Sequence, residues 1–163
     1  MNQNNDVQKH VVLATVENEP GVLNRIVSLF RRRRFNIEGI SAGHTEKEGI
    51  TKIAFTVDAK KTNVEQLIKQ VEKIVNVLSV EDVTFEDIIL AETVLIKLEI
   101  DEEERAKLNT AIEMYQATIE DIDSNSVLIQ IVGAPDKIDK FIEEMKEYKI
   151  QEMFRSGTSV MVK

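Results

Sequence analysis

Residues 10–30, which read HVVLATVENEPGVLNRIVSLF, decide the fold of this chain. The run 10–17 is rich in β-branched residues and predicts a strand that ends at the breaker 18–21. A helix is predicted next, because apolar side chains recur at the spacing of one helical face: Val22, Leu23, Ile26, Val27 and Phe30. Pro20 suits the first turn of this helix, where a missing N–H costs nothing. We therefore expect a strand that passes through a tight turn into a helix.

The residues that follow extend this start into the order strand, helix, strand, strand, helix, strand. Residues 36–42 and 51–58 are typical of two strands joined by a polar loop, and residues 77–85 of a closing strand. Thr62 and Glu65 have the spacing of a capping box for the second helix. The apolar face of that helix is predicted from its spacing: Val64, Leu67, Ile68, Val71, Ile74 and Val75.

The same order of elements returns in the second half of the chain. Residues 93–100 alternate like a half-buried strand, Asp101 can cap a helix, and Pro135 can open another. The remaining extended segments are residues 117–123, 127–132 and 150–162, the last of them interrupted near Gly157.

This pattern predicts an α+β fold of two tandem ferredoxin-like βαββαβ domains. We expect a disordered tail over residues 1–9, a first domain over 10–86 and a second over 92–163. Right-handed crossovers place both helices of such a unit on one face of its sheet. The uncovered face or edge then favours dimerisation, with sites made between chains.

Composition excludes several classes of function. The chain has no cysteine, which excludes disulfides and thiolate sites. No apolar run approaches the roughly 20 residues of a membrane span, and the polar start lacks the features of a signal peptide. We therefore expect a cytoplasmic protein. The net charge of −8 lies wholly in residues 87–163, with 17 acidic and 9 basic side chains, and it opposes binding to nucleic acid.

The basic run 31–34 at the end of the first helix permits two interpretations. It can favour the negative end of the helix dipole, or it can bind an acidic partner. RNA recognition on this topology needs exposed aromatic residues on the central strands. The third strand offers only Phe55, so we do not expect RNA binding. The two histidines, His10 and His44, are too few for a metal site, and no nucleophile or phosphate-loop motif is present.

The turn between the first strand and first helix is a candidate binding loop. The N–H groups of Gly21, Val22 and Leu23 stand where a helix leaves amides unpaired, and they can receive a carboxylate. Asn18 offers a carbonyl oxygen to an ammonium group. A carboxylate and an ammonium group are the two charged groups of a free amino acid. The alternative is a strand–helix turn with ordinary capping chemistry.

Several segments resemble the ACT domain family of acetolactate synthase (acetohydroxyacid synthase) small regulatory subunits. The most specific are Asn18–Ile26, Phe35–Ile40 and Gly43–Glu46. Looser similarity runs in family order to the end of the chain, over Val64–Gln70, Val77–Val80, Ile150–Glu152 and Arg155–Thr158.

The resemblance implies a regulatory chain with no catalytic residue, cofactor or metal of its own. It implies association with a large subunit that uses thiamine diphosphate, with magnesium and FAD also in that partner. The chain is then expected to activate the large subunit and to confer feedback inhibition by valine or a related branched-chain amino acid. It also implies a homodimer through the ACT domains. The effector site would join two chains, with residues of one facing residues of the other: Asn18, Pro20, Gly21, Val22 and Leu23 opposite Asn36 and Ile37.

One departure from the family concerns the turn before Asn36. Relatives often carry glycine where Arg34 stands, and a left-handed arginine there costs roughly 1–2 kcal/mol.

Two other functions stay open on the sequence. One is a stand-alone amino-acid-binding ACT protein that regulates a different enzyme. The other is a small-phosphate hydrolase on the same topology. That function needs an anion-binding loop with an arginine that contacts the phosphate, and the sequence shows no such loop.

Overall fold

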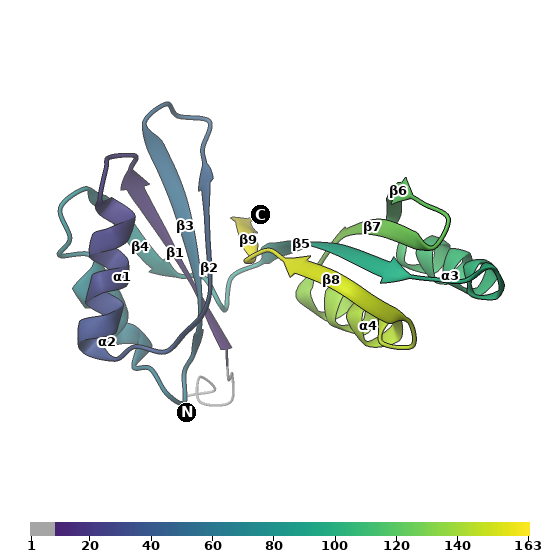
Figure 1. Cartoon of the computed structure of the whole chain (residues 1–163). Coiled ribbons are helices and arrows are strands. Elements are labelled where there is room, and N and C mark those ends of the chain that lie inside the picture. Colours follow the sequence, from purple (N-terminus) through teal and green to yellow (C-terminus); the bar gives the residue numbers. More distant parts are fainter. Residues whose placement is uncertain (1–8) are drawn as a thin grey trace. The chain divides into compact units, whose positions relative to one another are not determined.

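The computed structural model describes residues 9–163, which form two compact units (Figure 1). The first unit takes in the chain up to residue 89 together with residues 158–163, and the second takes in residues 90–157. Of the predicted tail, residues 1–8 lie outside the described residues, whereas Lys9 is already part of a strand. The last six residues, which the sequence assigned to the second domain, therefore group with the first unit.

The first unit has the predicted βαββαβ order. Its antiparallel sheet has the strand order β2-β3-β1-β4. The cross-strand pair of Glu17 with Ile50 places the end of β1 beside the hairpin that joins β2 to β3. The elements are β1 (Lys9–Glu17), α1 (Val22–Arg33), β2 (Ile37–His44), β3 (Ile50–Asp58), α2 (Val64–Val71) and β4 (Val77–Asp82).

The second unit repeats this topology with the strand order β6-β7-β5-β8. Its elements are β5 (Ile88–Glu99), α3 (Glu102–Tyr115), β6 (Thr118–Ile122), β7 (Ser126–Gly133), α4 (Pro135–Met145) and β8 (Lys149–Arg155). A short strand, β9 (Ser159–Val162), pairs with β5, and the Lys163 N–H donates to the Asp87 carbonyl oxygen at 2.9 Å. The predicted fold class is confirmed: the two units are ferredoxin-like repeats.

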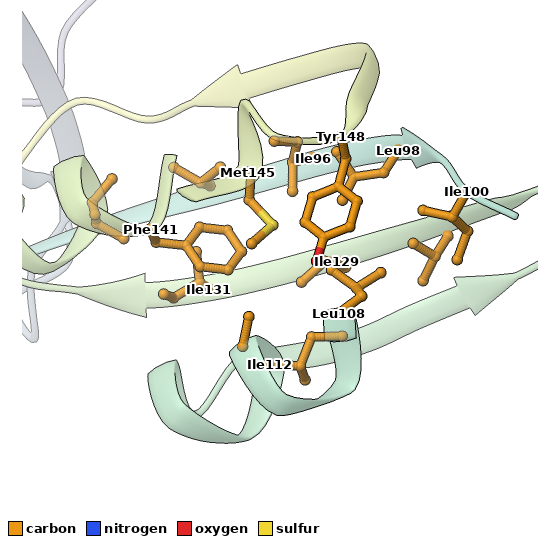
Figure 2. Packing of buried hydrophobic residues seen from close by; sticks show 14 residues of the cluster. Ile96, Leu98, Ile100, Leu108, Ile112, Ile129, Ile131, Phe141, Met145 and Tyr148 are labelled. Atoms are coloured by element: carbon orange, nitrogen blue, oxygen red, sulfur yellow. The ribbon is translucent and has the colours of Figure 1, made fainter. Parts of the chain in front are cut away.

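Each unit has its own hydrophobic core between its sheet and its two helices. In the first, the rings of Phe30 and Phe55 meet edge to face with centroids 5.1 Å apart. In the second, Phe141 and Met145 of α4 lie over the strand residues Ile129 and Ile131 (Figure 2). The two buried clusters share no residue. Apolar burial is the main favourable term in folding, so each repeat carries its own source of stability.

Several expectations at the helix ends need correction. Pro20 precedes α1, and Gly21 is the residue before its first turn. The cap of α2 is Asn63, whose side chain accepts the Gln66 N–H at 2.9 Å; the predicted capping box from Thr62 is wrong. In α3 the prediction is confirmed, since Asp101 forms a complete capping box.

The predicted inner faces of the first two helices were too wide. Leu23 and Val27 of α1 are 45% and 47% exposed, although the spacing placed them inside. Val75 lies beyond α2 and is 72% exposed. Leu29 is buried instead. Periodicity identifies a helix, but the packing of the neighbouring elements decides how wide its buried stripe is.

Candidate functional site

The β1–α1 loop is a tight turn that presents backbone amides at the start of α1. Pro20 and Gly21 occupy its central positions, and the Val22 N–H donates to the Glu19 carbonyl oxygen at 3.3 Å. Gly21 has φ 86° and ψ −5°, which with a preceding proline makes a type II turn. A side chain at this positive φ is strained, so glycine lets the chain turn here without that strain.

Two of the three amides predicted to receive a carboxylate are open. Within residues 9–163, the N–H groups of Gly21 and Leu23 have no hydrogen-bond partner, whereas Val22 uses its own in the turn. No side chain caps this helix end. The positive end of the α1 dipole is thus available to an anion.

Asn18 lies at the start of the same loop with a fixed backbone and an unoccupied side chain. Its N–H donates to the Gly49 carbonyl oxygen at 2.7 Å, which ties the loop to the β2–β3 hairpin. The side chain is exposed and makes no hydrogen bond to the described part of the chain. Its amide group can therefore accept from an ammonium group or donate to a carboxylate.

Asn36 and Ile37 lie at the opposite end of α1. A helix of 12 residues separates them from Gly21, a span of about 18 Å at 1.5 Å per residue. Asn36 is exposed, and Ile37 is half-buried against the first core. One chain therefore brings together Asn18 and residues 20–23 but holds Asn36 and Ile37 away from them.

The turn between α1 and β2 holds the Asn36 backbone in place. The Asn36 N–H donates to the Thr62 hydroxyl oxygen at 2.9 Å, and that hydroxyl donates back to the Asn36 carbonyl at 3.3 Å. Thr62 is itself buried at the end of a turn that begins at Asp58. The Lys60 backbone N–H donates to the Asp58 carboxylate at 2.9 Å and, with Lys61 nearby, holds the pKa of this carboxyl below its ordinary value.

Arg34 adopts the left-handed conformation that its position suggested, with φ 56° and ψ 35°. The Phe35 N–H donates to the Phe30 carbonyl at 3.0 Å and the Arg34 N–H to the Arg31 carbonyl at 3.3 Å. These two bonds are those of a Schellman motif. The turn keeps the geometry that glycine would give, so Asn36 is positioned despite the arginine.

Arg32 and Arg33 of the basic run line a shallow cavity of about 460 Å³ between α1 and the end of α2. Arg33 donates to the Gln70 side-chain oxygen at 3.1 Å across this cavity. The lining residues are Leu29, Arg32, Arg33, Gln70, Lys73 and Ile74. The run thus lies at the C-terminal end of α1, where the helix dipole favours positive charge, and it also contributes to a positively charged surface.

Sequence reasoning missed a polar cluster beside the loop. Asn76, which precedes β4, has φ 77° and contacts both Glu17 and Arg25. The only signal in the sequence is that asparagine tolerates positive φ better than most residues, and that signal does not identify contact partners.

Among the described residues, no group of three or more His, Cys, Asp and Glu side chains is placed to hold a metal ion. No helix in residues 9–163 combines the length and the apolar character that crossing a bilayer requires.

Comparison with known families defines the class of protein. A model of the "AHAS small subunit-like ACT domain" matches residues 13–79, which cover the β1–α1 loop and most of the first unit. A second model, "Small subunit of acetolactate synthase", matches residues 91–163. The first unit is thus a regulatory ACT domain, and the second is the domain that accompanies it in these small subunits.

Individual relatives agree with both models over nearly the whole chain. The acetolactate synthase small subunit of Bacillus subtilis is 40% identical over 95% of this chain and 91% of its own length. A probable acetolactate synthase small subunit of Archaeoglobus fulgidus is 36% identical over 95% and 97%. The crystal structure of the Thermotoga maritima small subunit is 31% identical, covers 96% of this chain and 98% of its own, and superimposes with a TM-score of 0.88. The chain belongs to the acetolactate synthase small-subunit family and is a regulatory rather than a catalytic chain.

Proposed function

We propose that this chain binds valine or a related branched-chain amino acid and thereby regulates an acetolactate synthase large subunit. The observation that carries the proposal is the pair of open amides on Gly21 and Leu23, beside the unoccupied side chain of Asn18. The carboxylate of the amino acid docks on the amides at the positive end of α1. Its ammonium group donates to the Asn18 carbonyl oxygen. The apolar side chain of the effector then faces a second chain.

A second copy of the chain completes the site in this proposal. Within one chain α1, which is about 18 Å long, separates Gly21 from Asn36 and Ile37, so both sets can meet one small ligand only across a dimer. Leu23 and Val27 on α1 and Ile40 on β2 are exposed apolar residues of the first unit. β2 is an edge strand of its sheet, and edge strands have backbone groups free to pair. These features support a homodimer through the ACT domains.

Regulation then follows from differential binding. An effector shifts the equilibrium between two arrangements only by its difference in affinity for them, typically about 1–3 kcal/mol. In this proposal the small subunit activates the large subunit, and valine reverses the activation. Thiamine diphosphate, magnesium and FAD belong to the large subunit, and the complex works in the cytoplasm. The relatives named as acetolactate synthase small subunits support this assignment.

Calorimetric titration of the purified chain with valine, leucine and isoleucine tests the proposal. We expect saturable binding of at least one of them, weakened about tenfold or more by Asn18→Ala, because a hydrogen bond to a charged group contributes about 1.5–3 kcal/mol. Asn24→Ala is the matched control, since Asn24 is an exposed asparagine on α1 outside the proposed site. Equal affinity of Asn18→Ala and the parent chain removes Asn18 from the site.

The alternative, a stand-alone ACT protein that regulates a different enzyme, predicts the same titration but a different partner. Size-exclusion chromatography of the chain mixed with its acetolactate synthase large subunit separates the two. Co-elution together with increased acetolactate formation supports the proposal. Amino-acid binding without either result supports the alternative.

A further inference from the structure

We infer that Asn76 is the positioning residue of the amino-acid loop: it clamps both ends of the β1–α1 turn and so sets the affinity for the effector. This inference rests on the proposed function, because it concerns the same site. Asn76 lies in the connection between α2 and β4, far along the sequence from the loop it holds.

The first contact of Asn76 is with the residue that ends β1. The Glu17 N–H donates to the Asn76 carbonyl oxygen at 2.9 Å, and the Asn76 side-chain amide donates to the Glu17 carboxylate at 2.6 Å. Backbone and side chain of one asparagine thus hold the same residue. The Glu17 position, immediately before Asn18, is doubly fixed.

The second contact reaches the other end of the loop through Arg25. The Arg25 guanidinium donates to the Asn76 side-chain oxygen at 3.1 Å, while its backbone N–H donates to the Gly21 carbonyl at 2.9 Å. Arg25 is therefore the link between Asn76 and the residue that carries an open amide. Residues 18–21 are enclosed between two anchors that meet at Asn76.

The residue type suits this task. Asn76 has φ 77°, a conformation that asparagine adopts more readily than most side chains. Glycine would adopt this backbone with less strain but would lose both side-chain contacts. Asn76→Gly therefore removes the clamp while keeping the turn and the carbonyl that accepts the Glu17 N–H. This makes it a selective test.

Valine titration of the full chain supplies the first measurement. We expect Asn76→Gly to weaken binding about tenfold, because a loop that is correctly placed only part of the time reduces the apparent affinity by that fraction. Gln116→Gly is the matched control: it also replaces a left-handed residue, φ 54°, by glycine, but in the second unit. The control is expected to bind like the parent.

A double-mutant cycle separates positioning from direct contact with the ligand. If Arg25 acts only through Asn76, then Arg25→Ala weakens binding and the double variant binds no more weakly than Asn76→Gly alone. Additive losses show that Arg25 acts independently of Asn76, and they overturn the clamp.

Backbone ¹⁵N relaxation of residues 18–23 without ligand gives an answer even if valine does not bind. We expect lower order parameters at Gly21 and Leu23 in Asn76→Gly than in the parent chain or Gln116→Gly. Unchanged order parameters overturn the inference, whatever the titration shows. If the parent chain binds no branched-chain amino acid while the loop loosens in Asn76→Gly, the proposed function fails and the positioning role stands.

Discussion

At residue 34 the backbone turns left-handed on an arginine, and the same turn recurs in the second unit on Gln116, with φ 54° and ψ 42°. In both units the turn ends the first helix of the repeat through the same pair of backbone hydrogen bonds. In the first unit the Phe35 ring also packs edge to face on Phe30 at 6.4 Å, the hydrophobic contact that usually accompanies a Schellman motif. Local contacts within residues 30–35 thus hold a conformation that the arginine side chain disfavours.

Replacing Arg34 by glycine is therefore expected to stabilise the chain by about 0.5–1 kcal/mol. Relief of the left-handed strain contributes about 1–2 kcal/mol, and the greater freedom of glycine in the unfolded chain offsets part of this. Urea unfolding measures the difference. Arg31→Gly, inside the last turn of α1, is the control and should destabilise by about 1 kcal/mol. A destabilising Arg34→Gly would contradict the assignment of strain to this residue.

At the scale of elements, Arg155 joins three parts of the second unit. From β8 it donates to the Glu92 carboxylate of β5 at 2.7 Å and to the Asp139 carboxylate of α4 at 2.6 Å. Glu92 is nearly buried, with 8% of its side chain exposed. The next residue, Ser156, accepts the Thr93 N–H at 2.9 Å. The segment Arg155–Thr158, part of the family resemblance, thus includes residues that hold β8 and α4 against β5.

Arg155→Met is expected to destabilise the second unit by about 2–3 kcal/mol. Loss of the guanidinium removes the Arg155 hydrogen bond and ion pair of the nearly buried Glu92 carboxylate, and breaking a fully buried pair typically costs about 3–5 kcal/mol. The expected value is lower because Arg155 is 32% exposed. Denaturant unfolding measures the change, and Lys107→Met, which removes an exposed pair with Glu147, should cost less than about 1 kcal/mol. Similar losses of stability for the two variants would show that the Arg155–Glu92 pair stabilises the chain no more than an exposed ion pair does.

For the whole molecule, the two units have separate cores and the same topology but different charge. Residues up to 86 carry equal numbers of acidic and basic side chains, so the excess of negative charge belongs to the second half. The candidate binding loop and the residues proposed to clamp it lie entirely in the first unit. We therefore expect that loss of core packing in one unit leaves the other intact.

Differential scanning calorimetry of two core variants tests this independence. Leu67→Ala and Phe141→Ala each remove a side chain with no exposed surface, one per unit, and should each cost about 2–5 kcal/mol. Each variant is expected to shift one thermal transition and to leave the other near its original temperature. A single transition that both variants shift equally would show that the units unfold together.

The order of elements was predictable because it depends on local chemistry. Proline opens α4, Asp101 caps α3, and alternation marks β5, an interior strand of the second sheet, much as these patterns indicated. The predictions failed where contacts with residues outside the local segment determine the role of a side chain. Thr62 has capping-box spacing, but its hydroxyl group hydrogen-bonds to the Asn36 backbone, and Asn63 caps α2 instead.

The candidate site was predictable only in part for the same reason. The type II turn and its open amides follow from the Pro-Gly pair and the helix start, which are features of consecutive residues. The proposed roles of Asn18 and Asn36 in binding stay predictions. The contact of Asn76 with Glu17 joins residues 59 positions apart, and no local pattern encodes such a contact.

Sequence alone was sufficient for two ferredoxin-like repeats, a resemblance to the regulatory ACT family and a tight turn into the first helix, because turns, periodicity and capping act over a few residues. The tertiary structure decided which amides stay open, where Asn36 lies relative to Gly21 and which residue contacts Glu17 and Arg25 beside the loop. Those features depend on side chains that meet across the fold. Their energies arise only when distant segments are packed together.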